Sequence, residues 1–279
     1  MPDNPAIWID GSPLAALPLP DRGLDYGDGL FETLLLRRDV PLYPELHLAR
    51  LKRGLQALAF PDCLEKVQVQ LESVLGSMSN ACDWSSLRLS VTRGGGRRGY
   101  APPVTPQPRI IIQIAQIERD CSLMSEPASV SVAKVKLALQ PMLAGVKHLN
   151  RLEQVLAAAE GQTQGVDEML LLDQANTVNS VSAGNLFVVR EGRLQTPDLC
   201  NSGVAGTRRQ LVIERWAPAL GLEVSATELT LEDLHNADEI FYSSSLFGTR
   251  PILSLDNLRW EEHKVCAALF EQFQLDLLQ

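Results

Sequence analysis

The sequence has few of the residues that hold metals or disulfide frameworks. Its four histidines lie far apart, and its five cysteines are odd in number, scattered and never spaced as Cys-x-x-Cys. A structural zinc site needs such ligands close together, and a secreted disulfide scaffold needs paired cysteines. We therefore expect no metal site, and we expect reduced thiols in a cytoplasmic protein.

Long apolar runs and an excess of positive charge are also missing. No apolar stretch approaches the roughly 20 residues that span a bilayer, and the N-terminus lacks the basic-then-apolar pattern of a signal peptide. The net charge is −9, whereas nucleic acids and anionic membranes attract a basic face. We expect no nucleic-acid partner and no membrane partner. A small anionic substrate stays open, because a local arginine cluster can override the global sign.

The chain is long and apolar enough to bury a large core. Its 279 residues, 45% of them hydrophobic, suffice for one large or two ordinary domains. The polar segment 118–128 has no clear period, so we expect it to link a smaller domain, 1–117, to a larger one, 129–279.

Apolar periodicity predicts alternating helices and strands in both parts. In the first, we expect helices over 44–58 and 64–75 and strands over 6–9, 31–37, 87–92 and 109–117. In the second, we expect strands over 129–139, 168–172, 185–190 and 239–243, a turn at 176–180, and helices over 150–161, 208–220 and 260–278.

Lys147 lies near the middle of the chain with no acidic residue within four positions on either side. Asn150 followed by Glu153 is a variant of the capping box, so a helix is predicted to begin at Asn150, just after this lysine. A lysine in that place either stays solvated or points into a cleft. Partial desolvation in a cleft would lower the pKa of the amine and make it a nucleophile for carbonyl compounds.

Two glycine-rich segments could shape binding loops. Residues 93–100 place Arg93, Arg97 and Arg98 on a glycine hinge that could close over a carboxylate, or that could be a plain exposed hairpin. Gly203–Thr207 precedes a predicted helix, and backbone N–H groups that converge at such a point suit a phosphate. Ser243–Ser245 adds three hydroxyls at the end of a strand.

The order of these segments resembles the fold type IV family of pyridoxal-phosphate enzymes, which includes branched-chain and D-amino-acid aminotransferases and aminodeoxychorismate lyase. The resemblance runs nearly end to end and is strongest to the lyase branch. It is carried by Asp21-Arg22-Gly23, Tyr26-Gly27-Asp28-Gly29, Phe31-Glu32-Thr33, His47-x-x-Arg50-Leu51, Arg93–Tyr100, Lys147–Gln154, Gly203–Thr207 and Ser243–Ser245.

The resemblance implies an α/β (α+β) chain with a two-domain D-amino-acid aminotransferase-like fold and pyridoxal 5'-phosphate between the domains. It also implies a homodimer whose partner loop helps to close the site. Lys147 would be the Schiff-base lysine and catalytic base. The cofactor would further contact Arg50, Ser180, Val204, Ala205, Gly206, Thr207 and Ser244, and the substrate would contact Phe31, Arg97, Arg98 and Tyr100.

Ser180 departs from the family pattern, because it stands where the family carries a glutamate beside the pyridine nitrogen. A neutral hydroxyl cannot keep that nitrogen charged as a carboxylate does, so the electron sink should be weaker. This favours a lyase that releases pyruvate to form aromatic 4-aminobenzoate, a step of folate biosynthesis. A branched-chain or D-amino-acid type aminotransferase is the alternative, and a non-catalytic relative is a third interpretation.

Overall fold

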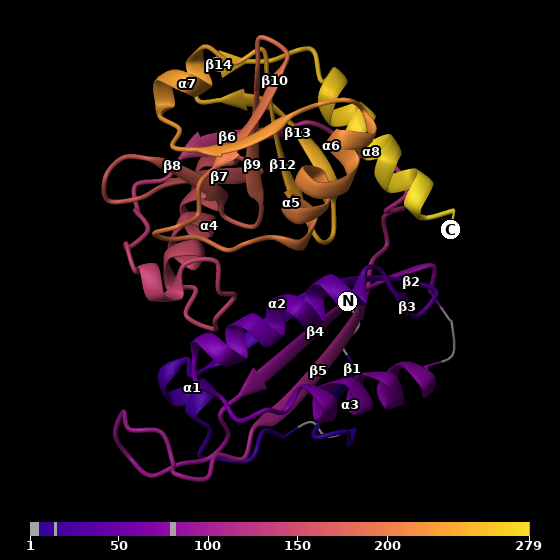
Figure 1. Cartoon of the computed structure of the whole chain (residues 1–279), viewed down its shortest axis with the longest axis vertical. Helices are drawn as coiled ribbons and strands as arrows, with labels where there is room; N and C mark the ends of the chain where they lie inside the picture. The colour runs from indigo at the N-terminus through magenta and orange to yellow at the C-terminus, as the bar shows by residue number, and fades with distance from the viewer. Residues whose placement is uncertain (1–5, 14–15, 79–81, 279) are drawn as a thin grey trace. The chain divides into compact units, whose positions relative to one another are not determined.

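The computed structural model describes residues 6–13, 16–78 and 82–278. The chain divides into two compact units, one made of 1–120 with 146–150 and the other of 121–145 with 151–279 (Figure 1). The short segment Val146–Asn150 thus belongs to the first unit although both of its flanks belong to the second. The linker at 118–128 between folding domains stays a prediction.

The first unit is an antiparallel sheet with helices. Its strands, in the spatial order β1-β5-β4-β2-β3, are β1 (Ala6–Ile9), β2 (Gly29–Arg37), β3 (Val40–Pro41), β4 (Trp84–Thr92) and β5 (Arg109–Gln116). Its helices are α1 (Arg22–Tyr26), α2 (Pro44–Ala57) and α3 (Leu64–Gly76). The helices predicted after Pro44 and Cys63 are confirmed, because strong apolar periodicity and Pro44 at the first helical turn specify them locally.

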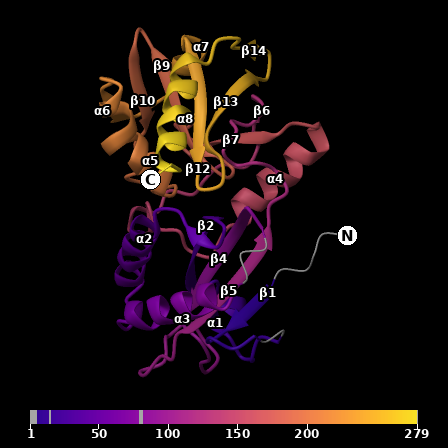
Figure 2. The same ribbon diagram turned by 90° about the vertical axis from the view of Figure 1, so that its right-hand side faces the viewer.

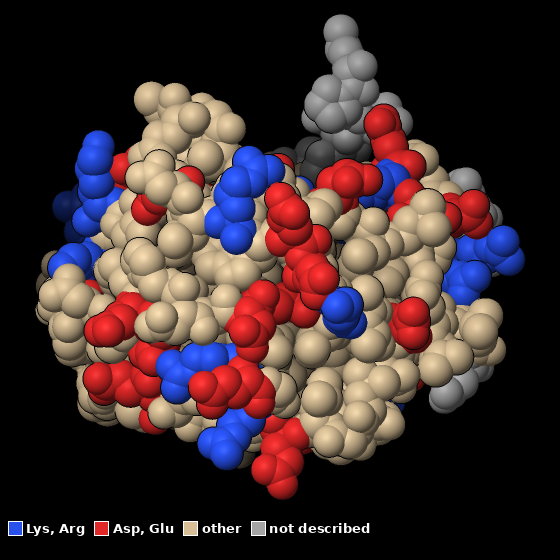
Figure 3. Space-filling view, turned by 90° about the horizontal axis from the view of Figure 1, so that it is seen from above, with Lys and Arg blue, Asp and Glu red and all other residues tan. Residues whose placement is uncertain are grey.

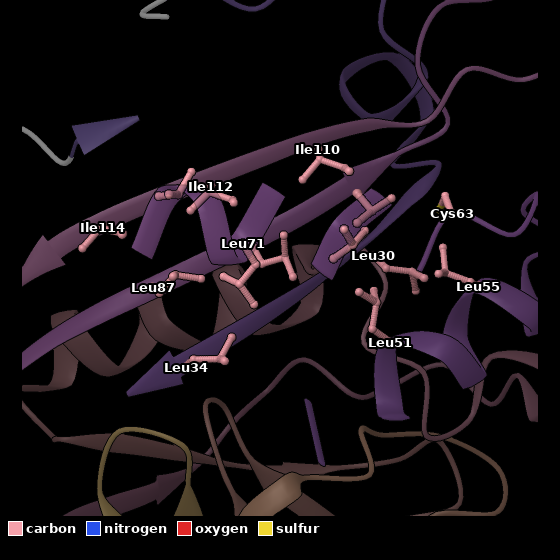
Figure 4. Close-up of a cluster of buried hydrophobic side chains, with 14 of the residues drawn as sticks. Leu30, Leu34, Leu51, Leu55, Cys63, Leu71, Leu87, Ile110, Ile112 and Ile114 are labelled. Atoms are coloured by element: carbon pink, nitrogen blue, oxygen red, sulfur yellow. The ribbon is translucent and has the colours of Figure 1, made fainter. Parts of the chain in front are cut away.

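The core of the first unit lies between its sheet and helices α2 and α3 (Figure 4). Alternation along β2 puts Leu30, Leu34 and Leu36 on the face that packs against leucines of the two helices. Burying each such leucine contributes about 1.5–3 kcal/mol. The same alternation puts Glu32 on this apolar face, so its carboxylate needs a partner there.

The second unit is a mixed sheet in the order β11-β10-β9-β12-β13-β6-β7-β8, with β14 added to β13 (Figure 2). Its strands are β6 (Ala128–Val132), β7 (Glu168–Leu172), β8 (Val178–Val181), β9 (Asn185–Arg190), β10 (Arg193–Pro197), β11 (Val224–Thr227), β12 (Glu239–Ser244), β13 (Gly248–Leu255) and β14 (Leu258–Arg259). Its helices are η1 (Pro141–Leu143), α4 (Leu152–Gln164), α5 (Thr207–Leu211), the π-helical turn η2 (Val212–Trp216), α6 (Ala217–Ala219), α7 (Leu231–His235) and α8 (Lys264–Asp276).

The predicted capping box at Asn150 is wrong. Helix α4 begins at Leu152, and the Asn150 amide instead donates to the carbonyl oxygen of Gly27 at 3.1 Å. The Glu153 carboxylate accepts from the backbone N–H of Ala138 at 2.8 Å. Both polar side chains are therefore used by neighbouring segments rather than by the helix end, so local spacing misplaced its start.

Three other predicted segments have different bounds. The turn expected at 176–180 ends at Thr177, and β8 begins at Val178 and pairs with β7, which places Asn179 and Ser180 in the sheet. The strand expected over 129–139 is the shorter β6, and the helix expected from Trp260 begins at Lys264. These bounds depend on pairing and packing with segments distant in sequence.

Acidic and basic side chains lie interspersed on the molecular face viewed in Figure 3. Within the described ranges, no helix has both the length and the apolar character needed to cross a membrane.

Candidate active site

Lys147 sits on a segment that pairs with the start of β2. The N–H of Phe31 donates to the Lys147 carbonyl oxygen at 3.0 Å, and the N–H of Leu149 donates to the Gly29 carbonyl oxygen at 3.0 Å. A side chain on Gly29 would meet Leu149 and the β4 backbone, so only glycine allows this close approach. The Lys147 Nζ consequently lies 4.2 Å from the centroid of the buried Phe31 ring.

Arg88 lies on the same ring and was not among the sequence candidates. Its guanidinium carbon is 3.9 Å from the Phe31 ring centroid. In the part of the chain that the structure describes, the Arg88 guanidinium forms no hydrogen bond or ion pair. Burial lowers its pKa from the ordinary value, although an arginine stays charged in proteins. A charged, half-buried guanidinium without a carboxylate partner is suited to bind an anion.

Arg50 and His47 of α2 meet Glu32 of β2 in a fully buried cluster. Arg50 donates to the Glu32 carboxylate through Nε at 2.8 Å and through one Nη at 2.5 Å, and His47 Nδ1 lies 2.7 Å from the same carboxylate. This bidentate pairing fixes the orientation of the Arg50 guanidinium. The predicted contact of Arg50 with a cofactor phosphate stays a prediction.

The Glu32 carboxylate is held ionised by these partners. Burial alone would raise its pKa, but Arg50, and then His47, lower the pKa from 4.5 to about 2. A pKa depressed on folding contributes stability that is complete above about pH 4.5 and is lost as the pH falls toward 2. The contribution at neutral pH is on the order of 3 kcal/mol.

We expect Glu32→Gln to destabilise the chain at pH 6 and to flatten the loss of stability between about pH 4.5 and pH 2. The free energy of unfolding in urea, measured at pH 6 and at pH 3, checks this. Glu45→Gln removes an exposed carboxylate at the start of α2 and is the matched control. It should keep the wild-type difference in unfolding free energy between pH 6 and pH 3. An unchanged difference in the Glu32 variant would contradict this role of Glu32.

The predicted cation loop divides into two parts. Arg93 is buried, and its guanidinium binds Asp28 and the carbonyl oxygens of Leu58 and Ala59, so its proposed part in closing over a carboxylate is wrong. Arg97 and Arg98 are exposed, and Tyr100 is 87% exposed. Their side chains are therefore accessible to a ligand, while Arg93 anchors the base of the loop.

The second unit contains the predicted phosphate turn. The backbone of Gly145 exchanges hydrogen bonds with this turn, donating to Gly203 at 3.0 Å and accepting from Ala205 at 3.1 Å. The Asn185 amide donates to the Val204 carbonyl oxygen at 2.9 Å, and a side chain at position 206 would overlap the Asn185 amide. Only Val146 separates Gly145 from Lys147, so covalent geometry alone keeps their Cα atoms within about 8 Å.

Hydroxyl groups face the start of the helix that follows the turn. Helical backbone runs without a break from Thr207 through α5, η2 and α6. The Thr207 and Ser245 hydroxyl oxygens lie 3.4 Å apart, whereas the Ser244 hydroxyl accepts from the N–H of Phe247 at 3.3 Å. Of the three serines predicted for this loop, Ser245 is therefore the one beside Thr207, and the predicted contact of Ser244 with the cofactor stays a prediction.

Ser180 is buried on β8, opposite Leu171 of β7. The neighbouring Asn179 amide donates to the Ser202 hydroxyl at 2.9 Å, next to the phosphate turn. This hydrogen bond connects β8, the strand that carries Ser180, to the segment just before the predicted phosphate turn.

The family model of class IV amino-transferases matches residues 29–255 of this sequence. The chain belongs to the class IV aminotransferase family. It is therefore an enzyme that uses pyridoxal phosphate, the cofactor of this family. All of the predicted site residues fall inside the matched range.

Curated and solved relatives agree with this membership. An aminodeoxychorismate lyase of Vibrio harveyi is 33% identical over 88% of this chain and 90% of its own length. The crystal structure of 4-amino-4-deoxychorismate lyase from Pseudomonas aeruginosa is 39% identical, with a TM-score of 0.89 over 97% of this chain and 99% of that one. The Escherichia coli branched-chain amino acid aminotransferase, at 23% identity and a TM-score of 0.86 over 97% of this chain and 94% of that one, shows the shared fold.

The residues present fit the phosphate of this cofactor. The turn at 203–206 is shaped so that only glycine is accommodated at position 206, and two hydroxyls face the helix start beside it. Backbone N–H groups at a helix start and hydroxyl donors are the groups that bind phosphate in proteins.

Proposed function

We propose that the enzyme is an aminodeoxychorismate lyase that releases pyruvate and forms 4-aminobenzoate for folate biosynthesis. The observation that carries the proposal is the pair of cations on the Phe31 ring, Lys147 at 4.2 Å and Arg88 at 3.9 Å. An amine beside an unpaired guanidinium suits a substrate with both an amino group and carboxylates. Similarity to two lyases at 33% and 39% identity supports the same reaction.

In this proposal, the cofactor phosphate is held by the turn Val204–Thr207, the hydroxyls of Ser244 and Ser245, and Arg50. Glu32 fixes the orientation of Arg50. Ser180 faces the pyridine nitrogen, and Lys147 binds the cofactor. When bound, pyridoxal phosphate supplies an electron-withdrawing ring beside the amino-bearing carbon of the substrate.

Lys147 carries the proton transfers. Its amine removes the proton from C4 of the substrate, and that electron pair forms a ring double bond while the C3–O bond to the enolpyruvyl group breaks. The ammonium of Lys147 then returns the proton to the methylene carbon of the leaving group, which gives pyruvate. Arg88 and the exposed Arg97, Arg98 and Tyr100 bind the substrate carboxylates, and Phe31 lies against the substrate ring.

Ser180 distinguishes this reaction from transamination. Formation of an aromatic product drives the lyase reaction, whereas transamination depends on the ring as electron sink through two half-reactions. We expect Ser180→Glu to raise the amino-transfer rate while sparing pyruvate release. Ser225→Glu, at an exposed serine of β11, is the control for adding a carboxylate. If Ser180→Glu changes neither rate, the electron-sink explanation fails.

Aminotransferase activity is the second candidate function, because the family model that matches residues 29–255 is that of class IV amino-transferases. The enzyme loaded with pyridoxal phosphate is incubated with an amino acid and a keto acid in one assay and with aminodeoxychorismate in another. We expect 4-aminobenzoate to form in the second assay and little exchange of amino groups in the first. A chain that shows no visible cofactor absorption after soaking in pyridoxal phosphate would instead support a non-catalytic role.

We also infer that the enzyme is a homodimer in the cytoplasm. The inference rests on the family resemblance together with the odd number and scattered positions of the five cysteines. Light scattering of the purified chain should give about twice the protomer mass of 30.6 kDa. A mass near that of one protomer would contradict the dimer.

A further inference from the structure

The segment between β4 and β5 contains an exposed loop, residues 95–108, without helix or strand. It carries Arg97, Arg98 and Tyr100, which the proposed function assigns to the substrate. An exposed loop of this length adopts many conformations unless specific contacts hold it. When a flexible loop binds a ligand, ordering of the loop residues costs binding free energy. A loop that is already held in its binding conformation therefore binds more tightly.

Arg22 of α1 makes those contacts. Its side chain is almost completely buried, with a residue exposure of 4%. The guanidinium donates to three successive carbonyl oxygens of the loop, Gly99 at 3.0 Å, Tyr100 at 2.8 Å and Ala101 at 3.4 Å. One side chain therefore fixes the path of the loop immediately after Arg98.

The position of Arg22 is itself fixed by Asp28. Arg22 Nε donates to Asp28 at 2.8 Å, and Arg93 Nε donates to the same carboxylate at 2.8 Å. Arg93 in turn binds carbonyl oxygens at the end of α2. A buried charge is tolerated when it is paired and hydrogen-bonded, as each of these three is.

Tyr26 adds a second attachment on the same short helix. Its hydroxyl accepts from the N–H of Gly99 at 3.1 Å, and its ring lies 5.6 Å from the ring of Tyr100. The Arg22 guanidinium carbon lies 4.8 Å from the Tyr26 ring centroid. The loop is thus bound through both the N–H and the carbonyl of Gly99.

We propose that Arg22 is a positioning residue that sets substrate affinity by holding residues 97–100 of the exposed loop in one conformation. Arg22 does not touch the substrate, because its donors are directed to Asp28 and to the loop carbonyl oxygens. The role of the loop in substrate binding rests on the proposed function, whereas the restraint of the loop by Arg22 does not.

Trypsin cleavage of the native holoenzyme after Arg97 and Arg98 measures the restraint directly. Arg22→Met keeps the apolar stem and leaves Asp28 paired with Arg93, so no buried carboxylate loses all of its partners. We expect cleavage at these two bonds to accelerate at least about tenfold, which corresponds to about 1.4 kcal/mol of lost restraint. Tyr26→Phe should accelerate it less, and Arg53→Met, an exposed arginine of α2, should match the wild type.

Kinetics of the same variants test the effect on substrate. We expect Arg22→Met to raise KM for aminodeoxychorismate about tenfold with kcat and the cofactor absorption unchanged. A wild-type cleavage rate in Arg22→Met would overturn the restraint by Arg22, whatever the rate in Tyr26→Phe. Fast cleavage with an unchanged KM would overturn the effect on affinity. A wild-type enzyme without lyase activity would instead refute the proposed function, and the cleavage rates would still decide the restraint.

Discussion

Lys147→Ala is expected to abolish both turnover and the visible absorption of the bound cofactor. In the proposed function, this amine binds the cofactor and moves the substrate proton, and no other lysine lies in the segment 146–150 that pairs with β2. Loss of a nucleophile that is also the general base lowers the rate by about 10⁴-fold or more. An absorption spectrum and a 4-aminobenzoate assay check the two effects.

Lys134→Ala is the matched control, because the Lys134 side chain is 88% exposed and forms an ion pair with Glu160. It should keep the wild-type spectrum and rate. If the Lys147 variant still forms 4-aminobenzoate, the assignment of this lysine fails.

Arg88→Met is expected to lower kcat/KM for aminodeoxychorismate by about 10- to 100-fold, mainly through KM. A hydrogen bond to a charged group contributes about 1.5–3 kcal/mol, and methionine keeps an apolar stem against Phe31 while removing the charge. The visible absorption should persist, because Lys147 and the phosphate turn are unchanged. Steady-state kinetics and the absorption spectrum check this.

Arg193→Met provides the control for loss of a positive charge, since Arg193 is an exposed residue of β10. Its kinetics should match the wild type. A normal KM in the Arg88 variant would remove Arg88 from the substrate site and leave its position on the Phe31 ring without a functional explanation.

Local sequence patterns predicted the features that depend on local chemistry. Helices α2 and α3 follow from apolar periodicity, and the turn before Thr207 follows from its glycines. Lys147 drew attention because no acidic residue lies within four positions of it, and its role in binding the cofactor stays a prediction. The resemblance to a family then gave these separate features one interpretation, which the match over 29–255 confirms at the level of the family.

Residues that depend on strand pairing could not be placed in this way. Arg88 reaches Phe31 because β2 and β4 pair in the register that puts Phe31 opposite Ser90 and Thr33 opposite Arg88. In the sequence, Arg88 is marked by the alternation of the polar residues Ser86, Arg88 and Ser90, which indicates that this strand has a second, less apolar face. The cations of the glycine-rich loop were more conspicuous, and one of them, Arg93, is a buried structural residue.

The most direct test of the proposed function is the product stoichiometry of the loaded enzyme acting on aminodeoxychorismate without any keto acid. We predict that pyruvate and 4-aminobenzoate form in equal amounts, and that neither forms with Lys147→Ala. Absence of both products from the wild-type enzyme, together with rapid exchange of amino groups between amino and keto acids, would contradict the lyase assignment.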